Sequence, residues 1–334
     1  MLKSISVSAI FCLALIYAKA QTLTMPPEIA QAYAKETRSF TGKPGKKYWE
    51  NHGRYTISVS MAPPDRTITG VEEITYFNNS PDTLHSLNMK LIVNVHSAGG
   101  RGGVGANPDA AIKVDNIQIN GAKADWDNSK AISTNQMVDL KSPLMPHDSV
   151  KLNIGWHYLL SKGFGREGAI DSTTFYVAYF YPRVAVYDDY KGWDTQPHTG
   201  GLEFYNDFND YTLKVTVPKN YLVWATGTLQ NPTQVLQPDF AKKLQESLAS
   251  DSTIHIATAQ DLANKNITAQ NATNTWVWIS TNITDVALAV SDHYDWDAAS
   301  VLVDDKAQRR VSVQAAFADA SQDFHHYVQF ARNS

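Results

Sequence analysis

Hydrophobic and polar residues alternate with a period of two along several stretches of the chain. In residues 54–61, Tyr55, Ile57, Val59 and Met61 alternate with polar side chains, and residues 66–78 return after Pro63-Pro64. Because successive side chains of a strand point to opposite faces, this pattern predicts half-buried strands. Similar signals predict further strands at residues 87–95, 114–119, 150–158, 175–187, 211–217, 221–225, 254–257 and 276–280.

Turn residues divide these predicted strands into an antiparallel arrangement. Asn120-Gly121 is the residue pair that a tight two-residue hairpin requires, because both positions need positive φ. Gly70, inside the returning strand, is expected to mark a bulge. Pro182 interrupts residues 175–187 and is expected at an edge, a bulge or a strand end. In residues 87–95, Asn88 and Lys90 are expected on the polar face, opposite Leu87 and Met89.

Helical periodicity is sparse. Residues 28–38 predict a short helix, and residues 239–249 place Phe240, Leu244 and Leu248 on one face. Near the end of the sequence, short strands are predicted at residues 300–303 and 310–313, followed by a helix over residues 315–332. The apolar face of that last helix contains Phe317, Phe324, Val328 and Ala331, and no stop signal follows it. We therefore expect that the sequence is cut short at Ser334.

The composition is that of a folded globular protein. The chain has 334 residues, 43% of them hydrophobic and 19% charged, which suits one large domain or two ordinary ones. The formal net charge of −4 gives no basic footprint for nucleic acid, so no nucleic-acid partner is expected.

The first twenty residues have the pattern of a secretory signal peptide. Lys3 precedes an apolar run over residues 5–17, and Ala18-Lys19-Ala20 follows as a cleavage signal. We expect cleavage after Ala20 and a secreted or periplasmic protein without a membrane span, because no later stretch approaches about 20 apolar residues. Cys12 lies inside this leader, and Phe11 before it does not suit a lipidation signal, so the mature chain is expected to lack cysteine.

The richest concentration of aromatic residues, aspartates and turn signals lies in residues 175–227. It contains Tyr181-Pro182-Arg183, a loop with Asp188-Asp189 and Gly192-Trp193, a strand that ends at Val217-Pro218-Lys219, and Ala225-Thr226-Gly227. In this order of motifs, together with residues 276–296, the chain from Tyr48 to Trp296 resembles the aminopeptidase N family of zinc metallopeptidases.

This resemblance implies a fold and a division of the chain. Residues 21–47 would be a lead-in segment, and residues 48–297 a mainly β, antiparallel sandwich or saddle-like domain of the aminopeptidase N N-terminal type. Residues 298–334 would contribute the first strand and helix of a thermolysin-like α/β catalytic domain, truncated at Ser334.

The resemblance also implies an activity, namely hydrolysis of N-terminal peptide bonds by a zinc-activated water. The zinc motif HExxH is absent from the sequence. We therefore predict that this chain alone is inactive and binds no zinc, and we assign it no catalytic and no metal-binding residue. The missing catalytic domain and a peptide substrate are its expected partners.

One substrate-binding position is implied by the resemblance. In this family the β domain supplies a Gln or Glu, shortly before the "FP" step, that binds the α-amine of the substrate. The corresponding residue here is Tyr179, between Ala178 and Phe180. A phenol is neither a carboxylate nor an amide, so different substrates are expected.

Two glycine-rich stretches match nucleotide-binding patterns only superficially. Residues 163–168 have the spacing of the dinucleotide fingerprint, but a β-prone segment follows where a helix should begin. Residues 99–105 lack the Gly-Lys-Ser/Thr ending of a phosphate-binding loop. We interpret both stretches as loops.

The remaining candidate groups are weaker. No two histidines are four residues apart, and His325 and His326 would point about 100° apart on a helix, so surface histidines are expected. Glu72 and Glu73 face opposite sides of a strand and cannot act as a pair. Solvated loop carboxylates, rather than calcium ligands, are expected at Asp188, Asp189 and Asp194. Core packing, or alternatively a sugar or peptide platform, is expected for Trp193, Tyr205, Phe208 and Tyr211.

Two alternatives to the metallopeptidase hypothesis remain open. The chain could be a secreted, non-catalytic β-sandwich module that binds peptides or glycans through its aromatic loops. It could also be a free-standing, truncated paralogue with a regulatory role.

Overall fold

The computed structural model describes residues 23–97, 108–130, 134–163, 167–199 and 204–334. The expected signal peptide with its cleavage point after Ala20, Cys12, and the glycines at 99–105 lie outside the described residues. The described residues divide into two compact units: those up to Trp49 together with Asp189–Lys191, and those from Glu50 onward without Asp189–Lys191.

The smaller unit is built around one helix. This helix, α2 (Pro27–Ala34), begins with proline, whose fixed φ suits the first turn, and it buries Ala32. The ring of Tyr33, in the last turn of the helix, stacks on Phe40 beyond it, with 4.3 Å between the ring centroids. The helix predicted over residues 28–38 is therefore confirmed in a shorter form.

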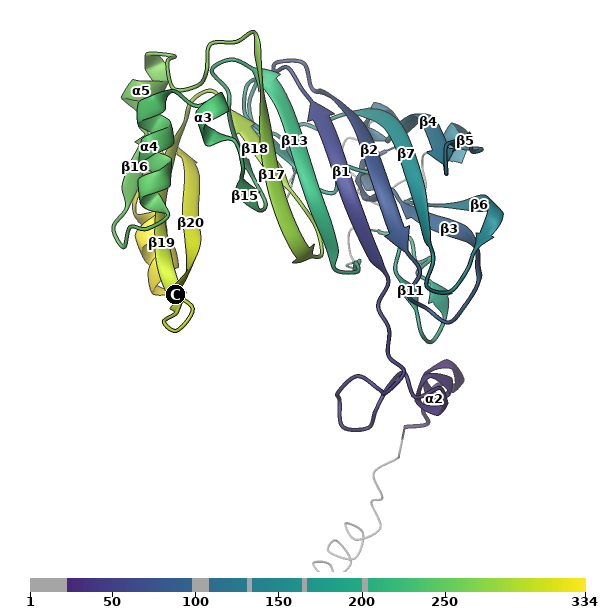
Figure 1. The fold of residues 1–334 in the computed structure, drawn as a ribbon. Coiled ribbons are helices and arrows are strands. Elements are labelled where there is room, and N and C mark those ends of the chain that lie inside the picture. Colours follow the sequence, from purple (N-terminus) through teal and green to yellow (C-terminus); the bar gives the residue numbers. More distant parts are fainter. Residues whose placement is uncertain (1–22, 98–107, 131–133, 164–166, 200–203) are drawn as a thin grey trace, which may run out of the picture. The chain divides into compact units, whose positions relative to one another are not determined.

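The larger unit contains an eight-stranded sheet (Figure 1). Neighbouring strands are antiparallel except for one parallel pair, β1 with β13. In spatial order the strands are β15 (Thr228–Leu229), β17 (Thr273–Ile283), β13 (Asn209–Pro218), β1 (His52–Ser60), β2 (Thr67–Phe77), β7 (Ser149–Leu159), β4 (Lys113–Ile119) and β5 (Ala122–Lys123).

Four smaller sheets complete the strands that the structure describes. They are β10 (Arg183–Val184), β3 (Leu84–Lys90) and β6 (Asn135–Leu144); β14 (Leu222–Ala225), β18 (Leu288–Ser291), β9 (Phe175–Val177) and β8 (Gly168–Ala169); β11 (Tyr187–Asp188) and β12 (Gly192–Trp193); and β16 (Ile254–Ala257), β19 (Tyr294–Asp304) and β20 (Arg309–Ala318).

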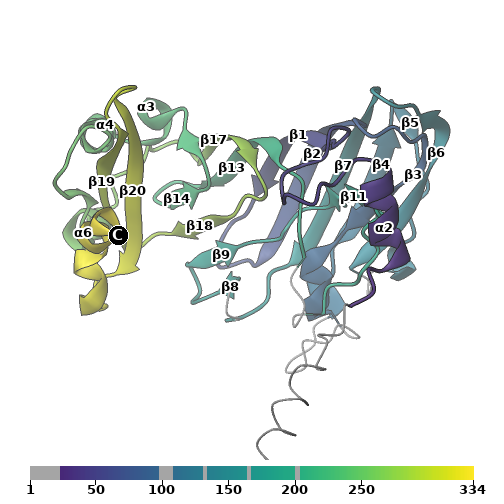
Figure 2. The ribbon, with the colours of Figure 1, turned by 90° about the horizontal axis from the view of Figure 1, so that it is seen from below.

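Short helices surround the sheets. The α-helices of the larger unit are α3 (Pro232–Val235), α4 (Pro238–Ser247), α5 (Ala259–Ala263) and α6 (Tyr327–Asn333). The 3₁₀ turns are η1 (Ile92–His96), η2 (Pro108–Ala110), η3 (Asn128–Lys130) and η4 (Gln322–His326). Helix α4 packs on β16, and α6 packs on β19 and β20 (Figure 2). No described helix combines the length and the apolar character that crossing a membrane requires.

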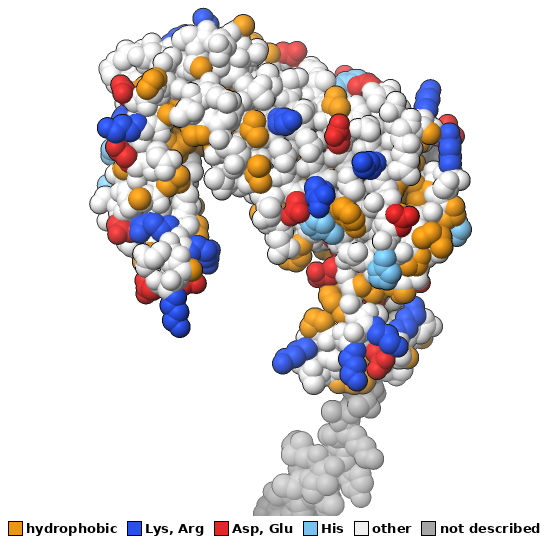
Figure 3. Space-filling view, viewed as in Figure 1, with side chains coloured by type: hydrophobic (Ala, Val, Ile, Leu, Met, Phe, Trp, Pro, Cys, Tyr) orange, Lys and Arg blue, Asp and Glu red, His pale blue; other side chains and the backbone are white. Residues whose placement is uncertain are grey.

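The alternation of the sequence fixes which face of the large sheet is buried. Tyr55, Ile57 and Val59 on β1 are each at most 2% exposed, while the residues between them are partly or fully exposed. The buried face packs with side chains of β3, β9, β14 and β18 into one continuous hydrophobic core. The predicted mainly β, antiparallel fold class is confirmed. On the face shown in Figure 3, positive and negative side chains are interspersed.

Two turn predictions had different outcomes. Asn120 and Gly121 adopt φ of 50° and 79° and join β4 to β5, so the predicted hairpin is confirmed. The bulge predicted at Gly70 is wrong, because β2 pairs in continuous register with both β1 and β7 there. Gly70 instead makes room for the Trp156 ring, since an added Cβ would lie 2.2 Å from Trp156 Cζ2.

Three segments differ from their predicted structure. The helix predicted over residues 315–332 is wrong at its start, because Ala315 and Phe317 belong to β20 and only α6 is α-helical. The strand predicted over residues 87–95 ends at Lys90 and continues as η1. Residues 175–187 form three short strands in different sheets, with Pro182 immediately before β10.

Candidate functional site

Tyr179, the residue that the family resemblance selected, lies between β9 and β10 with a φ of 60°. A bulky side chain rarely adopts this left-handed conformation. The flanking residues, Ala178 and Phe180, are buried and fix the backbone on both sides. The half-buried Tyr179 ring meets the Phe204 ring edge-on, with 5.1 Å between centroids. The surroundings therefore hold this strained residue in place.

A buried arginine anchors the segment that follows Tyr179. Arg183 is 2% exposed, and its Nη1 donates to Asp285 Oδ2 at 2.8 Å. The guanidinium also lies 4.6 Å from the Tyr181 ring centroid and 5.6 Å from that of Phe204. Burial opposes the charge of Arg183, but the Asp285 carboxylate, together with Tyr181 and Tyr211, outweighs burial and raises the pKa of the guanidinium.

Three tyrosines extend this polar network into the core. The Tyr181 hydroxyl lies 2.9 Å from Asp285 Oδ1 and 3.1 Å from the Tyr211 hydroxyl. The Tyr55 ring stacks on Tyr211, and the Tyr55 hydroxyl accepts a hydrogen bond from the Val184 backbone N–H. Burial raises the pKa of each of these phenols, so they stay neutral. The chain after Tyr179 is thereby tied to the central strands β1 and β13.

The loop after β12 is held by a second buried ion pair. Lys90 Nζ lies 2.8 Å from Asp194 Oδ2, and both side chains are at most 4% exposed. Lys90 also donates to the Gln196 carbonyl, and the Asn88 amide donates to the Asp194 carbonyl. The alternation predicted Asn88 and Lys90 opposite Leu87 and Met89, and because the loop covers that polar face of β3, both residues are buried.

The three aspartates predicted as solvated loop carboxylates have different environments. Asp194 is buried against Lys90, so the prediction is wrong for that residue. Asp189, whose side chain is 7% exposed, accepts hydrogen bonds from Thr37 and Arg38 inside the smaller unit. Asp188 accepts a hydrogen bond from the Tyr205 hydroxyl at 3.2 Å.

The four aromatic residues considered as a sugar or peptide platform also differ in their burial. Tyr211 belongs to the core, and Trp193 is partly buried against Tyr76 and Tyr187. Tyr205 and Phe208 are 44% and 47% exposed. Core packing is therefore confirmed for Tyr211, while two of the four rings remain available to solvent.

Glu72 and Glu73 face opposite sides of β2, as predicted. Glu73 is exposed, whereas Glu72 is fully buried and its carboxyl oxygens form no hydrogen bond with the described residues. Burial raises the pKa of Glu72 well above its ordinary value, and Arg183 opposes this effect in part. The alternation predicted that the two carboxylates face opposite sides, but it gave no sign that Glu72 would be buried without a hydrogen bond to the described residues.

Several of the described histidines pair with carboxylate or carbonyl oxygens. His52 pairs with Asp210, His255 with Asp297, and His325 with the Asp319 carbonyl. Among the described residues, no three His, Cys, Asp or Glu side chains come together as a metal site would require. These residues therefore do not fit a zinc ion. The described part of residues 163–168 leads into strand β8 rather than a helix, in agreement with the loop interpretation.

Sequence reasoning missed the residues that support Tyr179. Arg183 and Asp285 are far apart in the sequence, and neither belongs to a spacing pattern that marks a partner. Lys90 could have been suspected only from its position between apolar residues on a predicted strand. Tyr179 itself was selected by resemblance alone.

Comparisons with known proteins give matches at the level of structure. No protein-family model matches the chain, and no curated protein matches it. An M1 zinc metallopeptidase from Deinococcus radiodurans is 13% identical over 83% of this chain and 49% of that one, with a TM-score of 0.44.

Two variant M1 zinc metallopeptidase structures, one bound to L-arginine and one from Deinococcus radiodurans bound to a Tyr-Ser-Ala substrate, give the same identity and TM-score. Each alignment covers 83% of this chain, which spans about half the length of these solved structures.

Proposed function

We propose that this chain contributes the N-terminal β domain of a secreted zinc aminopeptidase, in which Tyr179 lies where a peptide substrate presents its N-terminus. The order of motifs from Tyr48 to Trp296 supports this proposal by its resemblance to the aminopeptidase N family. The observation that carries it is the backbone of Tyr179, with a φ of 60° between two buried neighbours. Residues kept in such conformations cluster at functional sites.

The chemistry available at Tyr179 suits an ammonium group. A phenol oxygen can accept a hydrogen bond from an α-amine, and the faces of Tyr179 and Phe204 can attract its positive charge. A neutral phenol attracts an ammonium less strongly than a carboxylate would. We therefore expect weaker binding of the free α-amine than in enzymes that carry Glu at this position.

Zinc, in the parent family, supplies the activated water for hydrolysis. The described residues do not fit that ion, so we assign them the binding of the substrate and not its hydrolysis. The leader that ends at Ala20 accounts for secretion in this proposal.

The test starts with the native protein recovered from its source. We expect an intact mass well above 37.0 kDa, bound zinc, and hydrolysis of aminoacyl anilides. A native mass that matches this chain without its leader, together with no hydrolysis, would overturn the proposal.

Variants of the native protein then test the role of Tyr179. We expect Tyr179→Ala to raise KM for aminoacyl anilides about tenfold, equivalent to about 1.4 kcal/mol, with a smaller effect on kcat. Tyr327→Ala removes an exposed ring on α6 and is the matched control. Equal KM values for Tyr179→Ala and the unaltered protein would refute the assignment of Tyr179.

A further inference from the structure

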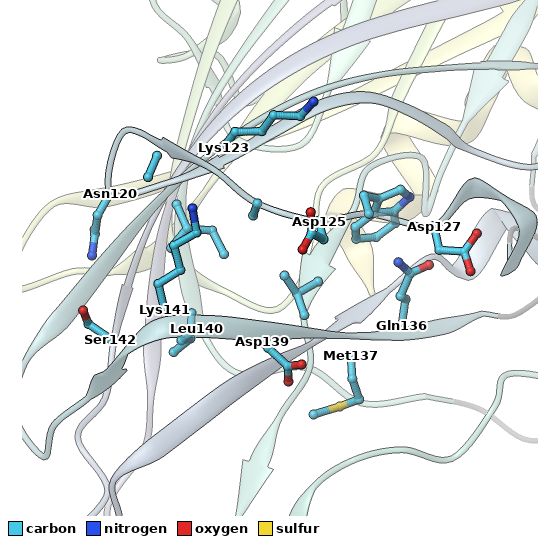
Figure 4. A pocket seen from close by; sticks show the side chains of 15 residues that line it. Asn120, Lys123, Asp125, Asp127, Gln136, Met137, Asp139, Leu140, Lys141 and Ser142 are labelled. Carbon is cyan, nitrogen blue, oxygen red and sulfur yellow. The ribbon is translucent and has the colours of Figure 1, made fainter.

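A groove of about 640 Å³ lies between the hairpin formed by β4 and β5 and the strand β6 (Figure 4). This volume is in the range of pockets that hold small ligands. None of the residues assigned above to the Tyr179 site lines it.

The eight-stranded sheet and the sheet of β10, β3 and β6 both end at this groove. Within the described residues, β5 pairs only with β4, and β6 pairs only with β3. The outer side of an edge strand presents backbone N–H and C=O groups that can pair with an added extended segment. The register between β3 and β6 shifts after Asp139, where the edge strand departs from regular pairing.

The floor of the groove is apolar. It consists of Ile119 and Ala124 from the hairpin side and Val138 and Leu140 from β6. At one end, the Gln136 side-chain amide forms two hydrogen bonds with the backbone of Asp127. Its nitrogen donates to the Asp127 carbonyl at 3.1 Å, and its oxygen accepts from the Asp127 N–H at 3.0 Å. This pairing links β6 to the segment that follows β5.

Two opposite charges line the groove. Figure 4 shows Lys141 rising from β6 toward the hairpin and Asp125 on the hairpin side, whereas Asp139 points away. Neither Lys141 nor Asp125 forms an ion pair with another described residue. Ser142 lies beside Lys141 at the end opposite Gln136.

We propose that this groove binds a short peptide with free termini, its α-amine at Asp125 and its α-carboxylate at Lys141. The apolar floor and the strand edge suit an extended backbone, and the charges suit the two termini. Six residue steps separate Gln136 from Ser142, which at about 3.3 Å each gives the groove a length of about 20 Å, enough for a short extended peptide. This site does not depend on the proposed aminopeptidase function.

Tetra-alanine is the probe, prepared free, N-acetylated, C-amidated and blocked at both ends. Calorimetric titration of the purified chain measures the affinity, and mass spectrometry confirms that the peptide stays intact. We expect each blocking group to weaken binding at least fivefold. Equal affinity for the free and doubly blocked forms, or no binding of the free form at millimolar concentration, would overturn the proposal.

Charge-removing variants assign each terminus. In Lys141→Met we expect free and amidated tetra-alanine to bind equally, while acetylation still weakens binding. In Asp125→Asn we expect free and acetylated tetra-alanine to bind equally, while amidation still weakens binding. Lys151→Met, at an exposed position on β7 outside the groove, is the matched control and should behave as the unaltered chain. If Lys151→Met abolished the preference for free over amidated tetra-alanine as Lys141→Met does, the assigned orientation would be wrong.

Discussion

At the scale of single residues, Glu72 is a carboxylic acid buried in an apolar environment. Its cross-strand neighbours are Ile57 on β1 and Ile154 on β7, and both are fully buried. Because burial raises the pKa of Glu72 well above its ordinary value, the folded chain keeps the proton that the unfolded chain loses near its ordinary pKa. Stability therefore falls as the pH rises above that ordinary pKa.

We predict that Glu72→Met stabilises the chain at pH 7.5 by about 1–3 kcal/mol, because a volume-conserving apolar side chain removes a buried group without a partner. Urea denaturation at pH 5 and pH 7.5 measures the difference, which should be larger at the higher pH. Glu73→Met, on the exposed side of the same strand, should change stability by less than about 0.5 kcal/mol. Equal effects of the two substitutions would contradict this account.

Asp207 gives a second prediction about pH. Burial, with added repulsion from Glu50 and Asp188, raises its pKa to about 7. Since the unfolded pKa is near 4, Asp207 makes the folded state progressively less stable between about pH 4 and pH 7.

We expect Asp207→Asn to be more stable than the unaltered chain at pH 8 by about 2 kcal/mol and to show a flatter dependence between pH 5 and pH 8. Chemical denaturation across this range measures both quantities. Glu50→Gln removes part of the repulsion that raises the pKa of Asp207. Stability should still fall with rising pH in this variant, but the fall should end at a lower pH. An unchanged pH profile in Asp207→Asn would show that another group titrates here.

Residue patterns predicted inward-facing apolar side chains better than buried polar ones. The alternation placed Tyr55, Ile57 and Val59 correctly, because the period of a strand alone decides their direction. It did not predict that the polar face with Lys90 is buried, because that burial depends on Asp194 in a distant loop. A local pattern contains no information about such a partner.

At the scale of elements, Gly70 and Trp156 form a cross-strand pair between β2 and β7. The Trp156 ring occupies the space where a Cβ on residue 70 would stand, and it packs against Phe180 on its other side. The pairing of β2 with β7 thus depends on the absence of a side chain at Gly70.

Gly70→Ala should therefore destabilise the chain by about 1–3 kcal/mol through overpacking. In a Trp156→Leu background the same substitution should cost at least about 1 kcal/mol less, because the obstructing ring is gone. Chemical denaturation of the unaltered chain, the two single variants and the double variant completes this double-mutant cycle. Additive effects would show that residues 70 and 156 do not compete for this space.

The C-terminal hairpin shows why an element can be assigned wrongly from its sequence. Phe317, Phe324 and Val328 have spacings that suit one helical face, yet Phe317 lies on β20, and Phe324 is 50% exposed. Pairing with β19 extends from Arg309 to Ala318 and satisfies the backbone of that segment. Tertiary pairing here overrides the local helical preference.

At the scale of the whole chain, the fold class follows from many strand signals that agree, whereas the candidate site depends on contacts among distant segments. The β9–β10 connection, Asp285 and Phe204 meet around Arg183 only after the sheets assemble. Periodicity therefore predicted the mainly β architecture, and only the family resemblance directed attention to Tyr179.

Hydrolysis by this chain alone is the property on which the domain assignment can be tested most directly. The sequence has no HExxH, and the described residues gather no set of metal ligands. We expect the purified 334-residue chain to show no hydrolysis of aminoacyl anilides above background, with or without added zinc. Turnover that a chelator abolishes and zinc restores would mean that this chain contains a catalytic metal site, and the assignment of its residues to substrate binding alone would be wrong.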